Sequence, residues 1–235
     1  MSLAGQGVVA IWNDITPEGR ADFYEWHNRE HMPERVGIPG FRRGRRYVAL
    51  AGASGGHPEF FTLYETDSPE VLASADYLGR LNHPTPWTQR AIAQFRNLSR
   101  SLCCTALSLG TGQGGTIMTL RYDVASGREE EQRRLLALRI LPALADRPGI
   151  VGVHLCLADR AASGIETEEK KGRAKALIPN WVILVEGGGE VALLEAACRA
   201  MLPAETLLAA GAVEPIERGL YRLEYSRCKT PGTVG

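Results

Sequence analysis

The order of apolar and polar segments divides the first half of the chain into alternating strands and helices. From residue 7, "GVVAIWND" is typical of a strand. A helix follows, with Thr16 as its N-cap and Pro17 at the first helical position. We expect this helix to end near Pro33, because a proline disfavours helical geometry at the residue before it. A strand, a strand, a helix and a strand are then expected at 44–50, 59–66, 68–81 and 99–109.

The second half repeats this β-α-β-β-α-β order. Strands are expected at 116–123, 150–159, 180–186 and 218–226, and helices at 128–141 and 190–202. Superposing Pro39-Gly40 on Pro148-Gly149 also places Pro142 on Pro33 without a gap. A charged, Gly/Ala-rich segment at 159–179 lengthens one loop of the second repeat, and its composition predicts an exposed, mobile loop.

Two such units in one chain predict an α+β protein made of two ferredoxin-like repeats. Each repeat has a four-stranded antiparallel sheet with helices on one face, so its bare face needs a partner. We expect the two bare faces to pack sheet-on-sheet, as a single-chain dimeric α/β barrel with helices outside. The repeats are assigned to 1–109 and 116–235, joined by a Gly-rich linker at 110–115. The G-x-G-x-x-G in this linker precedes a strand rather than a helix, so it predicts no dinucleotide site.

Composition is that of an ordinary globular protein, with 44% hydrophobic and 23% charged residues. The formal net charge is zero, so nothing favours nucleic acid or a membrane as a partner. No apolar run approaches the roughly 20 residues of a membrane span, and the pattern of a signal peptide is missing. The five cysteines form no CxxC pair. We expect a cytoplasmic protein with reduced cysteines.

The segment "WHNREHMPER" (26–35) concentrates ionisable side chains on the first helix. With residues 100° apart around a helix, His27, Glu30 and His31 lie on the side where Trp26 faces the sheet. The second repeat is mostly apolar at the corresponding positions: Leu135 for Trp26, Leu136 for His27, Arg139 for Glu30 and Ile140 for His31. The fold therefore does not need histidines there.

Two interpretations of this cluster remain open. Histidine suits proton transfer because its pKa lies near 6.5. In the catalytic interpretation His27 and His31 are acid/base groups and Glu30 orients one of them. In the structural interpretation the cluster is hydrogen-bonded, anchors the following turn and has no chemical role.

The same residues also match H-x-x-E-H, the inverted zinc-protease signature. A catalytic zinc needs a third protein ligand and an open position, and no downstream helix with a ligating glutamate is recognisable. We therefore predict no metal site. A single histidine can also bind haem, but no other feature of the sequence supports haem, and we expect no cofactor.

Residues outside this helix add candidates for substrate binding. On the second strand Arg43, Arg45 and Tyr47 share one face, while Arg42 and Arg46 take the other. We expect Arg43 or Arg45 to hold an anionic group of the substrate, unless the arginines only form a solvated strand end.

We expect the cavity itself to be lined by aromatic side chains. The candidates are Trp26, Tyr47, Tyr64 and Trp87, the last on a rigid loop at 81–90 that also carries His83. Alternatively, Trp87 closes the end of the barrel.

The repeat layout resembles the dimeric α/β-barrel superfamily in its tandem form. "FYEWHNREHMPERVGIPGFRRGRRY" (23–47) is similar to the first helix and second strand of EthD-like proteins, and more closely resembles W-H-x-x-E-H-x-P-E-R proteins. It departs from the EthD-like Trp-x3-His-x-Pro spacing, because His31-Met32-Pro33 lies one residue further from Trp26. Members of the superfamily include cofactor-free monooxygenases, isomerases, cyclases and haem enzymes, so the resemblance implies a fold without choosing a reaction.

These observations predict a small-molecule enzyme without an organic cofactor. Its acid/base chemistry would be of isomerase, dehydratase or monooxygenase type, on a partly apolar, oxygenated or carboxylated substrate. The alternative is a non-catalytic ligand-binding or assembly protein of the same fold. The expected partner is a small molecule, and a homodimer of the pseudo-dimeric chain is a further expectation.

Overall fold

Within the residues that the structure describes (2–50, 57–165, 167–170 and 179–230), eight antiparallel strands close into one barrel. The structure is a computed structural model. The order of the strands around the barrel is β1-β3-β2-β8-β5-β7-β6-β4. In chain order their bounds are β1 (Gly7–Ile15), β2 (Phe41–Ala49), β3 (Phe60–Thr66), β4 (Phe95–Gly110), β5 (Thr116–Val124), β6 (Ile150–Ala158), β7 (Trp181–Gly187) and β8 (Ala212–Cys228). The predicted α+β barrel is confirmed.

The barrel consists of two four-stranded halves with the same strand order, β4-β1-β3-β2 and β8-β5-β7-β6. Two long strands join them: β4 pairs with β1 and then with β6, and β8 pairs with β5 and then with β2. Both strands begin before the residue expected from the sequence. In β8 the missed part includes Pro215 between two glutamates, a composition that conceals a strand.

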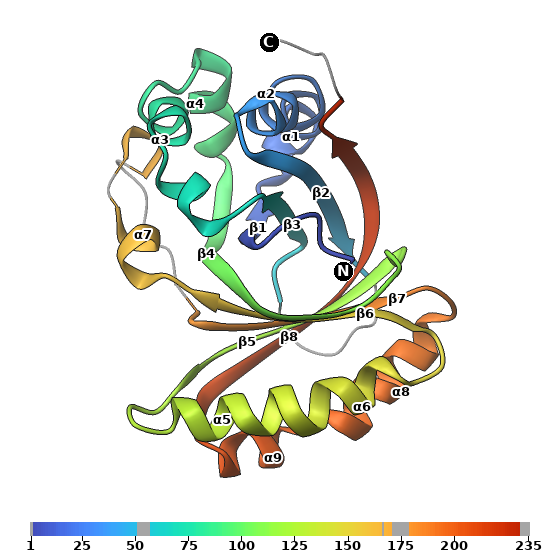
Figure 1. The fold of residues 1–235 in the computed structure, drawn as a ribbon. Helices are drawn as coiled ribbons and strands as arrows, with labels where there is room; N and C mark the ends of the chain where they lie inside the picture. The colour runs from blue at the N-terminus through green and yellow to red at the C-terminus, as the bar shows by residue number, and fades with distance from the viewer. Residues whose placement is uncertain (1, 51–56, 166, 171–178, 231–235) are drawn as a thin grey trace.

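The helices lie outside the barrel: α1 to α4 lie at one end in Figure 1 and α5, α6, α8 and α9 at the other, while α7 lies beside β4 of the first repeat. In the first repeat they are η1 (Pro17–Gly19), α1 (Arg20–Trp26), η2 (His27–His31), α2 (Met32–Gly37), η3 (Pro69–Ala73), α3 (Ala75–Asn82) and α4 (Pro86–Ile92). In the second repeat they are α5 (Glu129–Leu135), η4 (Leu136–Ile140), α6 (Leu141–Ala145), α7 (Arg160–Gly164), η5 (Glu168–Lys170), α8 (Val191–Met201) and α9 (Ala204–Ala209). The predicted loop at 81–90 is therefore wrong, because residues 81–82 belong to α3 and residues 86–90 to α4. No helix in the described ranges is long and apolar enough to cross a membrane.

The first helix of each repeat contains a π-helical turn, η2 or η4, at the same position. In η2 the Met32 N–H donates to the His27 carbonyl, five residues back. Pro33 follows, has no N–H and in a regular α-helix would clash with the carbonyl four residues before it. The wider π turn accommodates the proline, so the helix continues to Gly37 instead of ending at Pro33 as expected.

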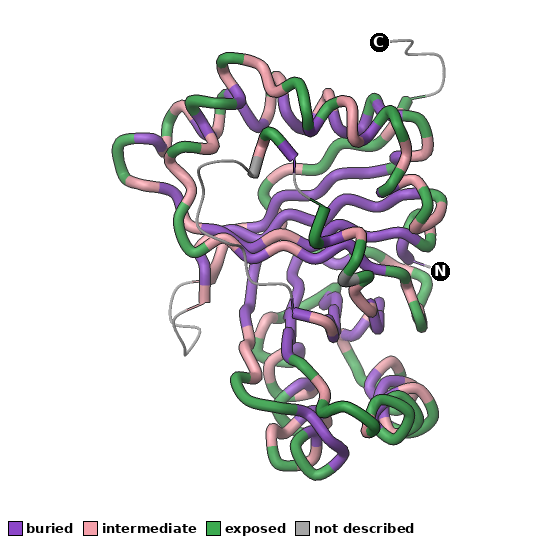
Figure 2. The backbone as a smooth tube through the Cα atoms, turned by 90° about the vertical axis from the view of Figure 1, so that its left-hand side faces the viewer, coloured by how far each residue is buried: buried purple, intermediate pink, exposed green. Residues whose placement is uncertain are grey.

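Apolar side chains form a core on both sides of each sheet. One cluster fills the barrel interior, and others pack beneath the helices of each repeat. Figure 2 shows the resulting band of buried strands. The predicted exposure of the 159–179 segment holds for a part of its described residues, which are Asp159, Ala161, Gly164, Ile165 and Glu168. Ser163 and Thr167 are buried instead, and the Glu168 N–H donates to the Asn82 Oδ1 of the first repeat. Residues 166 and 171–178 lie outside the described residues.

Candidate functional site

A cavity of about 70 Å³ lies between the helices of the first repeat and the outer face of its sheet. Its walls come from the first helix, from the sheet, from α3 and α4, and from the long loop of the second repeat. The polar and aromatic side chains among them are Trp26, His27, His31 and Arg35, then Asn13, Thr62, Tyr64, Tyr77 and Arg100, and finally Glu169. Four predicted site residues, Trp26, His27, His31 and Tyr64, therefore meet at one cavity.

Ring stacking holds the two histidines. The His31 ring lies 4.3 Å from the Trp26 ring, centroid to centroid, and 5.7 Å from the His27 ring, to which it is nearly parallel. Phe23 stacks on the other histidine, with 5.2 Å between the centroids of Phe23 and His27. Trp26 is itself fixed, because its Nε1 donates to Thr88 Oγ1 at 3.0 Å. The helix thus presents a rigid aromatic surface to the cavity.

His27 is buried between an arginine and a tyrosine. Its Nδ1 lies 3.0 Å from Arg46 Nη1, and its Nε2 lies 3.4 Å from Tyr64 Oη. Burial, and secondarily the positive charge of Arg46, hold the pKa of His27 well below the usual 6.5. The ring is therefore neutral at physiological pH.

Glu30 has a different role from the one expected. Its Oε1 accepts hydrogen bonds from Thr85 Oγ1 at 2.5 Å and from Thr88 Oγ1 at 3.2 Å. Thr85 is also the N-cap of α4, where its hydroxyl accepts from the Thr88 N–H. The carboxylate therefore ties the π turn to the start of α4 instead of orienting a histidine.

Arg43, Arg45 and Tyr47 do share one face of β2, as predicted, but this face lines the barrel interior. Arg43 donates to both oxygens of Glu65, and Arg45 donates to Glu65 and to Glu186. All three side chains are buried. The sheet therefore separates these three side chains from the histidines. The two guanidinium groups that were expected to bind a substrate anion are paired with Glu65 and Glu186 instead.

His83 and Trp87 also lie away from the cavity walls. His83 is exposed, and its Nδ1 lies 2.8 Å from the Gly79 carbonyl at the end of α3. Trp87 Nε1 donates to Asp22 Oδ1 at 2.8 Å, which packs α4 against α1. Their contacts are those of helix packing rather than of a lid.

Charged groups that the sequence did not single out line one end of the cavity. Arg35 is 3% exposed, donates to Glu34 at 3.1 Å and forms an ion pair with Glu169 of the second repeat. Arg100 donates to Tyr77 Oη at 2.5 Å. Arg35 follows His31 by one helical turn, a signal that the expected helix end at Pro33 concealed. The sequence holds no signal that brings Glu169 across from the other repeat.

The geometry does not fit the zinc-protease signature. The Glu30 carboxylate faces two threonine hydroxyls, and the Arg46 cation occupies the Nδ1 side of His27. Among the described residues, no three His, Cys, Asp or Glu side chains are grouped to hold a metal ion. A cavity of about 70 Å³ is also far smaller than a haem group.

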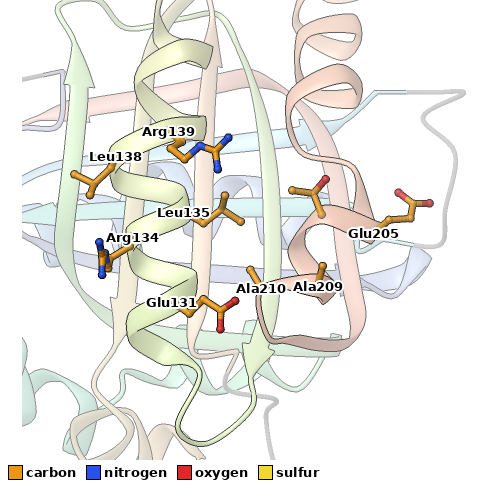
Figure 3. Close-up of a pocket in the computed structure, with 9 residues that line it drawn as sticks. Glu131, Arg134, Leu135, Leu138, Arg139, Glu205, Ala209 and Ala210 are labelled. Carbon is orange, nitrogen blue, oxygen red and sulfur yellow. The ribbon is translucent and has the colours of Figure 1, made fainter.

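The corresponding space of the second repeat is filled. Leu136, Ile140 and Val185 take the places of His27, His31 and Tyr64, and belong to one apolar core. The second repeat instead has an open groove of about 670 Å³ on its surface, between α5–η4 and α9. Figure 3 shows this groove, whose charged residues Glu131, Arg134, Arg139 and Glu205 are exposed and hence solvated.

Comparison with solved structures confirms the barrel fold. An anthrone oxidase-like protein superposes with a TM-score of 0.68 at 15% identity, covering 100% of this chain and 97% of that one. A candidate monooxygenase of Fusobacterium nucleatum gives 0.59 at 9% identity, over 97% and 96% of the two chains. A candidate chlorite dismutase gives 0.56 at 10% identity, over 94% and 95%.

The chain is thus similar in structure to dimeric α/β-barrel proteins along its whole length. Identities this low establish the fold alone. No protein-family model matches the sequence, and no curated protein matches it. The finer resemblance to EthD-like proteins stays a prediction.

Proposed function

We propose that the cavity of the first repeat is the active site of a small-molecule enzyme that works without an organic cofactor. One observation carries this proposal: the cavity-facing His27, His31 and Tyr64 stand where the second repeat packs Leu136, Ile140 and Val185. A duplicated fold that is stable with an apolar core has exchanged it for buried polar groups in one repeat only. Burying such groups costs free energy, and a ligand site explains why they are kept.

The walls define the class of substrate. The adjoining rings of Trp26 and His31, tilted by 32° to each other, suit a flat, partly apolar molecule. Tyr64, Thr62 and Asn13 offer hydrogen bonds to oxygen atoms on it. Arg35 and Arg100 add positive charge at one end, balanced in part by Glu169.

Among the three expected reaction types, we favour oxygenation. Two structural neighbours support this choice by their description, the anthrone oxidase-like protein and the monooxygenase candidate. In such a reaction the substrate supplies the electrons and dioxygen is the oxidant. For anthrone the balance is anthrone plus O₂ giving anthraquinone plus water.

Oxygen uptake tests the proposal. Anthrone is a three-ring probe into which oxygen is inserted. Hydroquinone is a one-ring probe closer in size to the cavity; O₂ oxidises it to benzoquinone and hydrogen peroxide without oxygen insertion, so it reports the use of dioxygen as oxidant. We expect the wild-type protein to accelerate oxygen uptake with at least one of them over a protein-free control, with the product identified by mass spectrometry. If neither reaction is accelerated, oxygenation of such compounds is ruled out.

One observation favours the alternative, a non-catalytic protein in which the His/Glu cluster is purely structural. The cavity is about 70 Å³, whereas a benzene molecule occupies an engineered cavity of about 150 Å³. A binding protein would show a ligand-dependent change in Trp26 fluorescence without any turnover. The two functions are therefore separated by measuring binding and oxygen uptake on the same samples.

A further inference from the structure

Arg46 is a buried cation whose three polar contacts are all made on the helix side of the sheet. Its side chain is 2% exposed, and Nε donates to Glu224 Oε2 at 2.9 Å. Nη1 donates to Asn28 Oδ1 at 2.8 Å and lies 3.0 Å from His27 Nδ1. Its guanidinium carbon is also 4.7 Å from the centre of the Tyr24 ring. These contacts hold the guanidinium in one orientation.

The contact with Arg46 decides which nitrogen of His27 carries the proton. A guanidinium has only N–H donors and no lone pair to accept with. Nδ1 must therefore be the unprotonated nitrogen, and in a neutral imidazole the proton is then on Nε2. Burial and the Arg46 charge, which together lower the pKa of His27, keep the ring in this neutral form.

The proton on His27 Nε2 in turn orients the hydroxyl of Tyr64. Nε2 lies 3.4 Å from Tyr64 Oη, so His27 donates and the tyrosine oxygen accepts. The hydroxyl proton of Tyr64 is then directed elsewhere, and Tyr64 lines the cavity. Burial raises the pKa of Tyr64, so the group remains a hydroxyl that can donate. A chain of hydrogen bonds polarised in one direction strengthens its last donor.

The second repeat lacks all three members of this chain together. By strand register and by the superposed prolines, Leu155 stands for Arg46, Leu136 for His27 and Val185 for Tyr64. All three are fully buried in one apolar cluster. The polar group at each of the three positions is therefore specific to the first repeat.

We propose that Arg46, His27 and Tyr64 form a relay in which Arg46 fixes the proton of His27 on Nε2, and His27 turns the Tyr64 hydroxyl toward the cavity as a hydrogen-bond donor. Arg46 and His27 are positioning residues, and Tyr64 is the residue that contacts the ligand. The ligand group it takes is a carbonyl or enolate oxygen, on which negative charge develops during reaction. Only this last step rests on the proposed function, because the proton position belongs to the free protein.

The nitrogen chemical shifts of the His27 ring test the relay without any substrate. In a long-range ¹H–¹⁵N spectrum at pH 7, we expect His27 Nδ1 to resonate as an unprotonated nitrogen and Nε2 as a protonated one. His27→Leu identifies the signals by their loss, and His154, in the barrel interior, is an internal reference. A proton on Nδ1, or a doubly protonated ring, overturns the inference.

Variants show whether Arg46 positions the His27 proton or only stabilises the fold. Arg46→Leu should let the His27 proton redistribute between both nitrogens, while Arg46→Lys, which keeps a group that can only donate, should restore the wild-type pattern. Arg42→Leu removes an exposed guanidinium from the same strand and should leave the spectrum unchanged. Tyr64→Phe should shift the Nε2 proton, because its acceptor is gone. An unchanged ring spectrum in both Arg46→Leu and Tyr64→Phe contradicts the relay.

Enzyme kinetics provide a second, independent test of the relay. If oxygen uptake is measurable, Tyr64→Phe should lower kcat about 100-fold, as expected for a donor to a developing oxyanion, with little change in KM. Adding Arg46→Leu should then lower it no further, because members of one unit are not additive. Full activity in Tyr64→Phe overturns the role of Tyr64. Absence of turnover in the wild type contradicts the proposed function, and the ring spectrum still decides the relay.

Discussion

At the scale of single residues, neighbouring ionisable side chains of one motif have different roles in the structure. His27 and His31 face the cavity, whereas Glu30 holds the start of α4 through two threonine hydroxyls. The difference follows from the partner that each side chain meets. A helical wheel places all three on one side of the helix, but it does not identify those partners.

Removing the Glu30 carboxylate should therefore weaken the fold without touching the relay. We expect Glu30→Ala to lower the free energy of unfolding by about 1–2 kcal/mol, because two hydrogen bonds to a partly buried carboxylate are lost. Glu25→Ala is the matched control, since Glu25 forms an exposed ion pair with Arg29 on the same helix. Urea unfolding measures both. A loss of oxygen uptake in Glu30→Ala without loss of stability would restore the catalytic interpretation of Glu30.

The sequence predicted the cavity-facing histidines but not most of their surroundings. His27, His31 and Trp26 were found because local helical spacing suffices to place them. Strand alternation correctly separated Arg46 from Arg43 and Arg45, yet the face with Arg43 and Arg45 was chosen as the ligand-binding one. The choice depended on which face of the sheet meets the helices, and that is set by long-range packing rather than by alternation along one strand.

At the scale of elements, helix–sheet packing makes room for Tyr64. Gly44 on β2 lies where a Cβ would come within 2.1 Å of Met32 Sδ and 2.9 Å of Tyr64 Cε1. The second repeat has the buried Val153 at this position. A side chain fits there because Val185 stands in place of the larger Tyr64. The glycine at position 44 thus leaves the space that the Tyr64 ring occupies in the first repeat.

An added methyl group at Gly44 should disturb both stability and site. We expect Gly44→Ala to lower the free energy of unfolding by about 1–3 kcal/mol, as overpacking does, and to shift the His27 ring signals through Tyr64. Gly37→Ala is the control, because nothing lies within 4 Å of a Cβ at Gly37. Chemical denaturation and the ring spectrum check the prediction. A Gly44→Ala protein as stable as the wild type would show that the helix and sheet are loosely packed.

The expected ends of elements were less accurate than their order. The order of strands and helices was predictable because each repeat has the same apolar segments. The continuation of α2 past Pro33 was not, since it depends on a π turn that a regular 3.6-residue period does not describe. The short helices α4 and α9 were missed for a similar reason, being only 7 and 6 residues long.

At the scale of the whole molecule, a buried ionic network inside the barrel joins the two repeats. Glu65 and Glu186 occupy matching positions of β3 and β7, and Arg45 donates to both. Burial alone would raise the pKa of Glu186. Hydrogen bonds from His154 and Arg45, the Arg45 charge and the Gly114 N–H outweigh burial and lower it to about 2.

This network should make stability depend on acid pH. Because the pKa of Glu186 is lower in the folded protein than its usual 4.5, its contribution is complete above about pH 4.5 and is lost as the pH falls toward 2. We expect Glu186→Gln to destabilise the protein by about 3 kcal/mol at pH 7 and to flatten this part of the pH profile. Thermal unfolding from pH 7 to pH 3 measures both effects.

The exposed pair of Glu131 with Arg128 provides the control. Glu131→Gln should change stability at pH 7 little, because surface pairs contribute little. If Glu186→Gln shows the same acid dependence as the wild type, Glu186 is not the group responsible.

The central claim is that the first repeat carries a site built from polar residues at three positions where the second repeat is apolar. A triple variant that installs the residues of the second repeat, with Arg46→Leu, His27→Leu and Tyr64→Val, tests it most directly. Oxygen uptake with anthrone and hydroquinone is compared between wild type and variant, with circular dichroism confirming that the variant folds. We predict acceleration by the wild type and only the protein-free rate with the folded variant. A folded variant that retains the wild-type rate would contradict the claim.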